Sequence, residues 1–309
     1  MNRFDNKQTT LLSRTELRTV KGQILYWCLF AILVIVAGVT LFPCIWMVLN
    51  AFKTPREIAA GNTFIPENFS LKSAIEQILY AWDMLEMERS IVNTLFLSLT
   101  KCAITVLCSG FAGYVLSKRR QKGMGVVFTL VVWTMMMPGS VRTVSTYLSY
   151  LSFPFIIDDG FDSVTNVNVL NTYIPFWVSA AAGSFTLILF KNAFDAIPNT
   201  LVDAARIDGC SNVRIFFQLM LPLAKPTVFY VMMGALSGPW SDYFTPYLLL
   251  SDKSKYTVPA WLFVIESKTG VTQNVYMMGL IFASIPPAIL YLFFQRRMSG
   301  GIMIGAVKG

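Results

Sequence analysis

Six long runs of apolar residues divide the chain, and the stretches between them hold nearly all of its charges. Their approximate limits are 24–49, 91–116, 124–146, 171–190, 227–250 and 276–294. Each run is long enough for the roughly 20 residues that a helix needs to cross a hydrocarbon core. Because backbone exposed to lipid must satisfy its own hydrogen bonds, we expect helices rather than strands. The pattern predicts an all-α membrane protein with six transmembrane helices over residues 24–294, an N-terminal segment at 1–23 and a C-terminal tail at 295–309.

Composition supports a membrane protein. Hydrophobic residues make up 55% of the 309 residues and charged residues only 14%, with a mean hydropathy of +0.56. A soluble globular chain has about 45–50% apolar and about 25% charged residues. Too few charges remain to cover a water-facing surface of this size. The same figures exclude a disordered chain, a collagen and a small disulfide-rich secreted scaffold.

The distribution of charge predicts the orientation. Sixteen of the 25 Lys and Arg residues fall in the two termini and the loops after the second and fourth runs, where only five acidic residues lie. The other side carries eight basic and eleven acidic residues. By the positive-inside rule, both termini are cytoplasmic. The net charge of +8 therefore describes orientation in the membrane, and we expect no nucleic-acid partner.

Catalytic chemistry is poorly supported. The chain has no histidine, which removes Ser-His and Cys-His nucleophile pairs and His-ligated zinc. The five cysteines lack metal-ligand spacing, and there is no phosphate-binding loop of the G-x-x-x-x-G-K-[ST] type. We expect no catalytic, cofactor or metal site in this chain. A membrane enzyme that uses paired Asp, or Ser with Lys, is disfavoured because acidic residues are nearly missing from the apolar runs.

The loop at 191–226, on the predicted cytoplasmic side, is the most informative stretch. Pro198 ends the fourth run, and Asn199 or Thr200 can cap a new short helix. Gly209 ends that helix where a left-handed residue is needed. Ser211 can cap a second helix, which we expect to run until Pro222 breaks it. The loop therefore predicts a helix–turn–helix, and an amphipathic hairpin resting on the membrane is the simpler alternative.

The motif Asp203-Ala204-Ala205-x-x-Asp208-Gly209, followed by Leu221-Pro222, resembles the coupling loop of permease subunits in binding-protein-dependent ABC importers. That loop is usually written E-A-A, then Gly, then L-P, so Asp203 replaces the usual Glu. The resemblance covers nearly the whole chain and narrows to the carbohydrate, maltose-type family and its smaller six-span permease. The segments that carry it are Pro43-x-x-Trp46, Ala51-Phe52-Lys53-Thr54, Asn93-Thr94-Leu95, Met137-Pro138-Gly139, Gly238-Pro239-Trp240-Ser241-Asp242 and the ending Gly305-Ala306-Val307-Lys308-Gly309.

The resemblance implies a type I ABC importer permease fold in the bacterial cytoplasmic membrane, and import of a di- or oligosaccharide. The implied partners are a second homologous permease, two ATPase subunits that bind ATP and Mg, an extracytoplasmic solute-binding protein, the carbohydrate and membrane lipid. ATP hydrolysis would occur in the ATPase subunits, so this chain would not be an enzyme. Residues implied to contact the ATPase are Asp203, Ala204, Ala205, Arg206, Asp208, Gly209, Leu221 and Pro222, and in the tail Gly305, Val307 and Lys308.

A few residues are candidates for the transport pathway. Lys101 and Asp242 are the ionisable residues most clearly inside the apolar runs, where charge is usually functional. We expect a polar role at the subunit interface or pathway rather than direct sugar binding. Trp240, Tyr243 and Tyr247 recur at helical spacing along the fifth run and can stack on a sugar. Packing or a position at the membrane interface is the favoured interpretation for these aromatic residues.

Two alternatives to sugar import remain. The same machine can carry another polar solute, of the polyol or glycerol-phosphate type, because the binding protein largely selects the cargo. A secondary transporter predicts inverted repeats and midplane acids in several spans, and the sequence shows neither. In the loop at 50–89, the spacing of Leu71, Ile75, Ile78, Leu79 and Trp82 predicts a short surface helix.

Overall fold

The structure is a computed structural model that describes residues 19–61, 63–67, 69–118, 122–156, 164–266 and 270–305. Four helical stretches in these ranges are long and apolar enough to cross a membrane, and six are if each of two bent helix pairs is counted as one span. The four are α1 (Val20–Ala51), α4 to α5, α8 to α9, and α16 (Gln273–Gly305). The second stretch comprises α4 (Met87–Ile104), a π-helical turn η2 (Thr105–Ser109) and α5 (Gly110–Lys118), and the third comprises α8 (Ile174–Ala181) and α9 (Ser184–Asp195). The prediction of a predominantly helical membrane fold is confirmed.

The third and fifth predicted spans are not straight. The third consists of α6 (Met124–Met136) and α7 (Gly139–Leu151), which meet at an angle of 111°. Met137 at the break is extended, with ψ 122°, as is usual for a residue before proline. The fifth consists of α13 (Lys225–Ser237), a 3₁₀ turn η4 (Gly238–Trp240) and α14 (Phe244–Leu249). The chain leaves helical geometry between Trp240 and Phe244, so the run at 227–250 is divided into α13 and α14.

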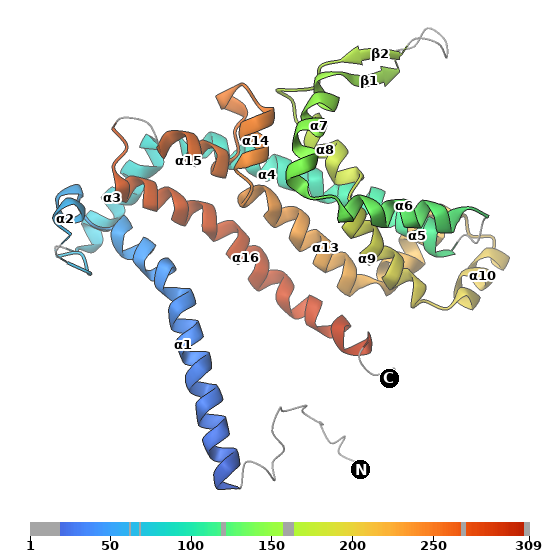
Figure 1. Ribbon diagram of the computed structural model, residues 1–309, viewed down its shortest axis with the longest axis horizontal. Helices are drawn as coiled ribbons and strands as arrows, with labels where there is room; N and C mark the ends of the chain where they lie inside the picture. Colours follow the sequence, from blue (N-terminus) through green and yellow to red (C-terminus); the bar gives the residue numbers. More distant parts are fainter. Residues whose placement is uncertain are drawn as a thin grey trace.

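The remaining elements are short. At one end of the bundle lie α2 (Pro55–Ala60), α3 (Leu71–Met84), η5 (Lys253–Lys255) and α15 (Val258–Glu266). Near the other end lie α10 (Asn199–Ile207), α11 (Asn212–Ile215), a π-helical turn η3 (Phe216–Met220) and α12 (Leu221–Leu223) (Figure 1). The surface helix expected in the 50–89 loop is α3. An antiparallel hairpin, β1 (Phe153–Ile156) paired with β2 (Val164–Val167), departs from the purely helical prediction.

Two clusters of buried side chains hold the bundle together. One joins the start of α4 to α15 and α16, and its fully buried members include Leu85, Val258 and Leu262. The other joins α5, α9 and η3 around Phe190, Phe194 and Phe216. The second cluster lies next to α10, so it determines how the short helices at that end are attached to the long ones.

Helix α1 stands apart from this bundle. It leaves the other helices near α3 and runs away from them (Figure 1), and it contacts the bundle mainly through α16. Its apolar side chains are exposed along nearly its whole length, and only Gly22, Asn50 and Ala51 are buried. A helix that is apolar on all sides is stable only with lipid or protein around it.

Candidate functional site

The loop at 191–226 folds as a helix–turn–helix. Helix α10 ends at Ile207, and Gly209 follows with φ +79°, the left-handed conformation that the sequence predicts there. Ser211 caps α11 as predicted, and its hydroxyl accepts a hydrogen bond from the backbone N–H of Arg214 at 3.3 Å. The expected cap at Asn199 or Thr200 was wrong, because Pro198 holds the cap position and makes no side-chain cap bond.

Helix α10 presents most of its surface outward. Val202, which is 2% exposed, is its one buried residue. Ala204 is exposed and Ala205 is half-buried. The remaining predicted contact residues of this turn are also exposed: Asp203, Arg206, Asp208 and Gly209. The Arg206 guanidinium pairs with the Asp203 carboxylate at 3.3 Å, which holds both side chains on this face but contributes little stability because the pair is solvated.

The second helix is attached to the long helices by an aromatic side chain. Phe216 is 0% exposed, and its ring stacks on that of Phe111 in α5 with centroids 3.9 Å apart. The rings of Tyr114 and Phe194 lie against the same side chain at 6.0 and 6.4 Å. Motion of this end of the loop must therefore accompany motion of α5 and α9.

The break after the second helix lies two residues beyond its predicted position. Pro222 is exposed one residue before the end of the helix, which is continuous from α11 through η3 to α12. The helix ends at Leu223, and α13 then runs at 90° to it. Leu221 packs against the aromatic cluster. The helix therefore runs past Phe216 and ends within two residues of Pro222, as the sequence predicts.

A lysine joins α5 to the entry of α10. The Nζ atom of Lys118 donates hydrogen bonds to the backbone oxygen of Ile197 at 2.6 Å and to Oδ1 of Asn199 at 3.1 Å. A pocket of about 270 Å³ lies beside these groups and is also lined by Val202, Asp203 and Arg206. Sequence reasoning missed Lys118, which looked like one more cytoplasmic charge.

A second cavity lies among the long helices. It measures about 410 Å³ and is lined by residues of α4, η2, α8, α9 and α13. Lys101 lines it from α4, with the hydroxyl groups of Thr105, Ser179, Thr186 and Tyr230. Asp242 interacts electrostatically with Lys101 from the break between η4 and α14. Its carboxylate also accepts a hydrogen bond from the backbone N–H of Thr245 at 3.0 Å.

The aromatic residues predicted to share one helix face do not do so. Trp240 is 5% exposed and belongs to the packed core. Tyr243 and Tyr247 lie beyond the break, where both are exposed and pack on Phe263 of α15 with ring centroids at 4.8 and 5.2 Å. The break separates Trp240 from the two tyrosines, so these three side chains do not form the single aromatic face expected along the fifth run.

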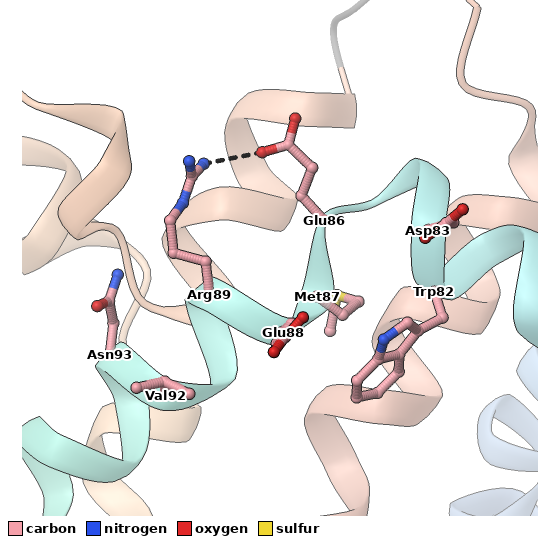
Figure 2. Close-up of a pocket in the computed structure, with 8 residues that line it drawn as sticks. All are labelled: Trp82, Asp83, Glu86, Met87, Glu88, Arg89, Val92 and Asn93. Carbon is pink, nitrogen blue, oxygen red and sulfur yellow. Dashed lines mark hydrogen bonds and ion pairs between the residues drawn. The ribbon is translucent and has the colours of Figure 1, made fainter.

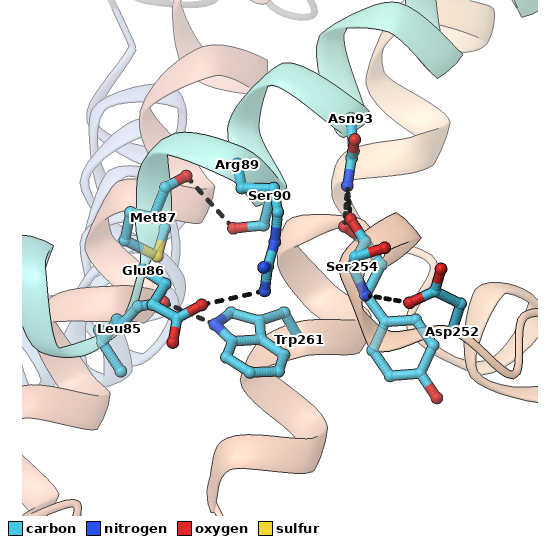
Figure 3. A network of polar contacts seen from close by, with 10 residues as sticks. Leu85, Glu86, Met87, Arg89, Ser90, Asn93, Asp252, Ser254 and Trp261 are labelled. Atoms are coloured by element: carbon cyan, nitrogen blue, oxygen red, sulfur yellow. Dashed lines mark hydrogen bonds and ion pairs between the residues drawn. The ribbon is translucent and has the colours of Figure 1, made fainter.

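The end of the bundle opposite α10 carries a polar network that sequence reasoning did not identify. A pocket of about 450 Å³ is formed at the junction of α3 and α4, and its acidic residues are Asp83, Glu86 and Glu88 (Figure 2). Arg89 pairs with Glu86 at 3.0 Å and lies over the ring of Trp261, whose indole N–H donates to the backbone oxygen of Leu85 (Figure 3). Glu86 has φ +47°, a conformation uncommon for a residue with a side chain.

The start of α4 is also bound to the segment that follows α14. The amide of Asn93 donates to the backbone oxygens of Ser254 at 2.7 Å and Tyr256 at 3.1 Å (Figure 3). The Thr94 hydroxyl accepts from the backbone N–H of Val258 at 2.9 Å. Hydrogen bonds from Ser254 hold the pKa of Asp252 below its usual value. The Asn93-Thr94 pair therefore joins two segments more than 150 residues apart.

The predicted tail contact cannot be placed in full. Gly305 is the last residue of α16, whereas Val307 and Lys308 lie outside the described residues. Over the described ranges, no group of three or more Cys, Asp or Glu side chains is arranged to hold a metal ion.

The long helices, the helix–turn–helix and the sequence motif coincide with a known family. Residues 105–302 match the family described as "Binding-protein-dependent transport system inner membrane component". The chain belongs to this family. It is therefore a transporter component of the inner membrane type, and its helix–turn–helix lies inside the matched region.

Relatives of this transport component extend along most of its length. It is 32% identical to the arabinooligosaccharides transport system permease protein AraQ of Bacillus subtilis (strain 168), over 70% of this chain and 72% of AraQ. It is 26% identical to the polygalacturonan/rhamnogalacturonan transport system permease protein YtcP of the same organism, over 94% of this chain and 100% of YtcP.

Its fold matches a solved transporter. A chain in the crystal structure of a bacterial ABC transporter involved in the import of the acidic polysaccharide alginate superposes with a TM-score of 0.73, covering 93% of this chain and 99% of that one. The two are 21% identical, so the likeness concerns the fold. The fold is that of a type I ABC importer permease.

Proposed function

We propose that the chain is the transmembrane permease subunit of a binding-protein-dependent ABC importer that takes up a di- or oligosaccharide. Membership in the family and the transport systems named for AraQ and YtcP support this assignment. The charge distribution supports an orientation with both termini in the cytoplasm, which puts α10 on the cytoplasmic side.

The observation that carries the proposal is the construction of the helix–turn–helix. Its outer face exposes Ala204, where a partner backbone can approach closely, and Ile207, which is 87% exposed. Its inner side is fixed to α5 and α9 through Phe216. A protein that binds the outer face therefore moves the long helices when it moves, which is the mechanical requirement for a rigid-body switch between two states.

The partner that fits this face is an ATPase subunit, which would bind ATP and Mg in its own site. Asp203, Ala204, Ala205, Arg206, Asp208 and Gly209 would meet the ATPase directly, and Leu221 and Pro222 would set the orientation of the loop behind them. The tail residues Gly305, Val307 and Lys308 would meet it as well. A second, homologous permease would complete the pathway, and a binding protein would deliver the sugar at the end that carries α3 and α15.

Copurification tests the partner assignment. A mild detergent extract of the complex should contain a second permease and an ATPase. Ala204→Trp should remove the ATPase because its side chain occupies the approach to α10, whereas Ala59→Trp, exposed on α2 at the opposite end, should retain it. Uptake of an oligosaccharide by a chain that copurifies with neither partner would contradict the proposal.

For the pathway, Asp242 has a testable polar role beside Lys101. Asp242→Ala should reduce uptake and leave assembly with the second permease and the ATPase unchanged. The two readouts separate a pathway defect from misfolding. Unchanged uptake would remove Asp242 from the pathway.

A further inference from the structure

The cavity beside Lys101 combines one cation with hydroxyl groups and aromatic rings. Its volume of about 410 Å³ lies within the range of about 300–1,000 Å³ for small-molecule sites. Four hydroxyl groups line it, and the exposed rings of Phe185 and Tyr230 border it. Such a lining, largely apolar with a few placed polar groups, is that of a ligand site rather than a packing defect.

Lys101 is the one ionisable side chain in the lining, and it lies about midway along the stretch Met87–Lys118. Among the described residues, no acceptor is bound to its Nζ atom; Asp242, which lies outside the lining, attracts Lys101 electrostatically but is not within the 4.0 Å of an ion pair. A charge at this depth is costly unless it is paired. The cavity therefore favours an occupant that brings a negative charge to Lys101.

The number of donors distinguishes a carboxylate from a phosphate. Phosphate sites in proteins collect several backbone N–H groups or bidentate Arg side chains around the anion. Here a single ammonium is supplemented by hydroxyl groups, of which Ser179 and Thr186 already donate to the backbone oxygens of Phe176 and Gly183. They retain lone pairs that can accept from sugar hydroxyl groups. A sugar that carries one carboxylate and several hydroxyl groups matches this set of one ammonium and several protein hydroxyl groups.

We propose that this cavity is a binding site for a uronic acid unit, with the sugar carboxylate paired to Lys101 and the ring between Phe185 and Tyr230. The inference rests on the proposed function and refines it, since it names acidic oligosaccharides as the substrate class. It assigns Lys101 to direct substrate contact, which the sequence alone did not favour over a role at the subunit interface.

A matched pair of ligands tests the site. The probes are an unbranched trisaccharide of a hexuronic acid and the same trisaccharide with every carboxyl group reduced to a primary alcohol. Binding is measured by calorimetry on the complete permease–ATPase complex in lipid nanodiscs, without nucleotide or binding protein. The wild-type complex should bind the acidic trisaccharide at least about tenfold more tightly, the factor expected for one charge-assisted contact.

Variants then assign the preference to Lys101. Lys101→Gln should bring the two affinities to within about twofold, and Lys101→Arg should keep a preference because it keeps the charge. Lys72→Gln removes the same charge from the exposed face of α3 and should change neither affinity. The comparison of the two ligands on the wild-type complex needs no variant, so equal affinities there overturn the inference even where Lys101→Gln fails to assemble.

Equal affinities in the wild-type complex, or binding of neither probe, would overturn the inference. So would a preference that survives in Lys101→Gln. The proposed function has a separate readout: a complex that imports the neutral trisaccharide with its binding protein, yet shows no preference, refutes the uronic acid site alone. A chain that purifies without an ATPase refutes the proposed function.

Discussion

The ring of Phe216 lies flat against that of Phe111, with centroids 3.9 Å apart and planes inclined by 23°. The first residue belongs to the helix–turn–helix and the second to α5, one of the long helices. Since the interior of a protein is close-packed, two rings in such contact move together. This pair therefore links the helix–turn–helix mechanically to the membrane-spanning part of the molecule, in addition to the bond between Lys118 and Asn199.

Phe216→Ala should separate these two parts. Replacing a buried phenylalanine with alanine costs about 3–5 kcal/mol in a packed core, so the thermal midpoint of the purified complex should fall and sugar uptake should be lost. Phe217→Ala is the matched control: that side chain is 45% exposed, so its removal should lower the thermal midpoint and uptake less. An equal decrease of the thermal midpoint and of uptake in both variants would show that the burial of Phe216 is not what couples the two parts.

Lys118→Met should loosen the entry to α10. The variant keeps the length of the side chain but removes the donors to Ile197 and Asn199, worth about 1–2 kcal/mol for a half-buried charged donor. We expect faster hydrogen exchange of the α10 amides and ATP hydrolysis that no longer drives full uptake. Lys122→Met, on an exposed lysine four residues later, should leave the exchange rates unchanged. Unchanged exchange in Lys118→Met would contradict the role of this lysine.

Gly209 offers a test in which backbone conformation acts alone. Its φ is +79°, and a Cβ atom added there would meet nothing within 4 Å. Gly209→Ala should therefore cost about 1–2 kcal/mol through the left-handed conformation alone, and Gly209→Asn should cost less because Asn tolerates it. Circular dichroism melting of the three proteins in detergent measures the order. Equal stability of the Ala and Asn variants would show that the backbone of this turn can leave the left-handed conformation without cost.

Gly113 lies where α5 packs closely against α9. A Cβ atom there would lie 2.7 Å from Cβ of Phe190 and 2.9 Å from the backbone nitrogen of Lys191. Because backbone cannot move aside as a flexible side chain does, Gly113→Ala should force the helices apart and cost about 1–3 kcal/mol, as overpacking does. Gly125→Ala in α6, where a Cβ atom meets nothing within 4 Å, is the control. A thermal shift shared by both variants would indicate a helix propensity effect instead.

The features that were predictable from sequence are those decided within one segment. The apolar runs, the surface helix α3 and the glycine turn at Gly209 each depend on hydropathy or dihedral preference over a few neighbouring residues. The candidate site was predictable to the same extent: the motif indicated α10 and its turn. The cap of α11 at Ser211 was predictable too, but that of α10 was not, since Asn199 bonds to Lys118, 81 residues away, instead of capping its own helix.

Proline positions illustrate the limit. Pro138 lies directly before α7 at a bend of 111°, whereas Pro222 lies one residue before its helix ends at Leu223, ahead of a bend of 90°. Both prolines lack a backbone N–H and restrict the residue before them, so each lies close to a break, but the sequence does not say on which side of the proline the helix ends. Where a helix ends is in part a tertiary outcome, since η3 immediately before α12 is held by the packing of Phe216.

The amino-acid sequence by itself determined that this chain enters a membrane and that its 191–226 loop forms a helix–turn–helix, because lipid partitioning and local backbone geometry depend on the segment alone. Only the tertiary structure decided that Phe216 is buried against Phe111, that the fifth span leaves helical geometry after Trp240, and that Lys101 lines a cavity together with residues of η2, α8, α9 and α13. Those outcomes depend on which distant side chains meet, and contacts between separate helices are not encoded in the periodicity of any one of them.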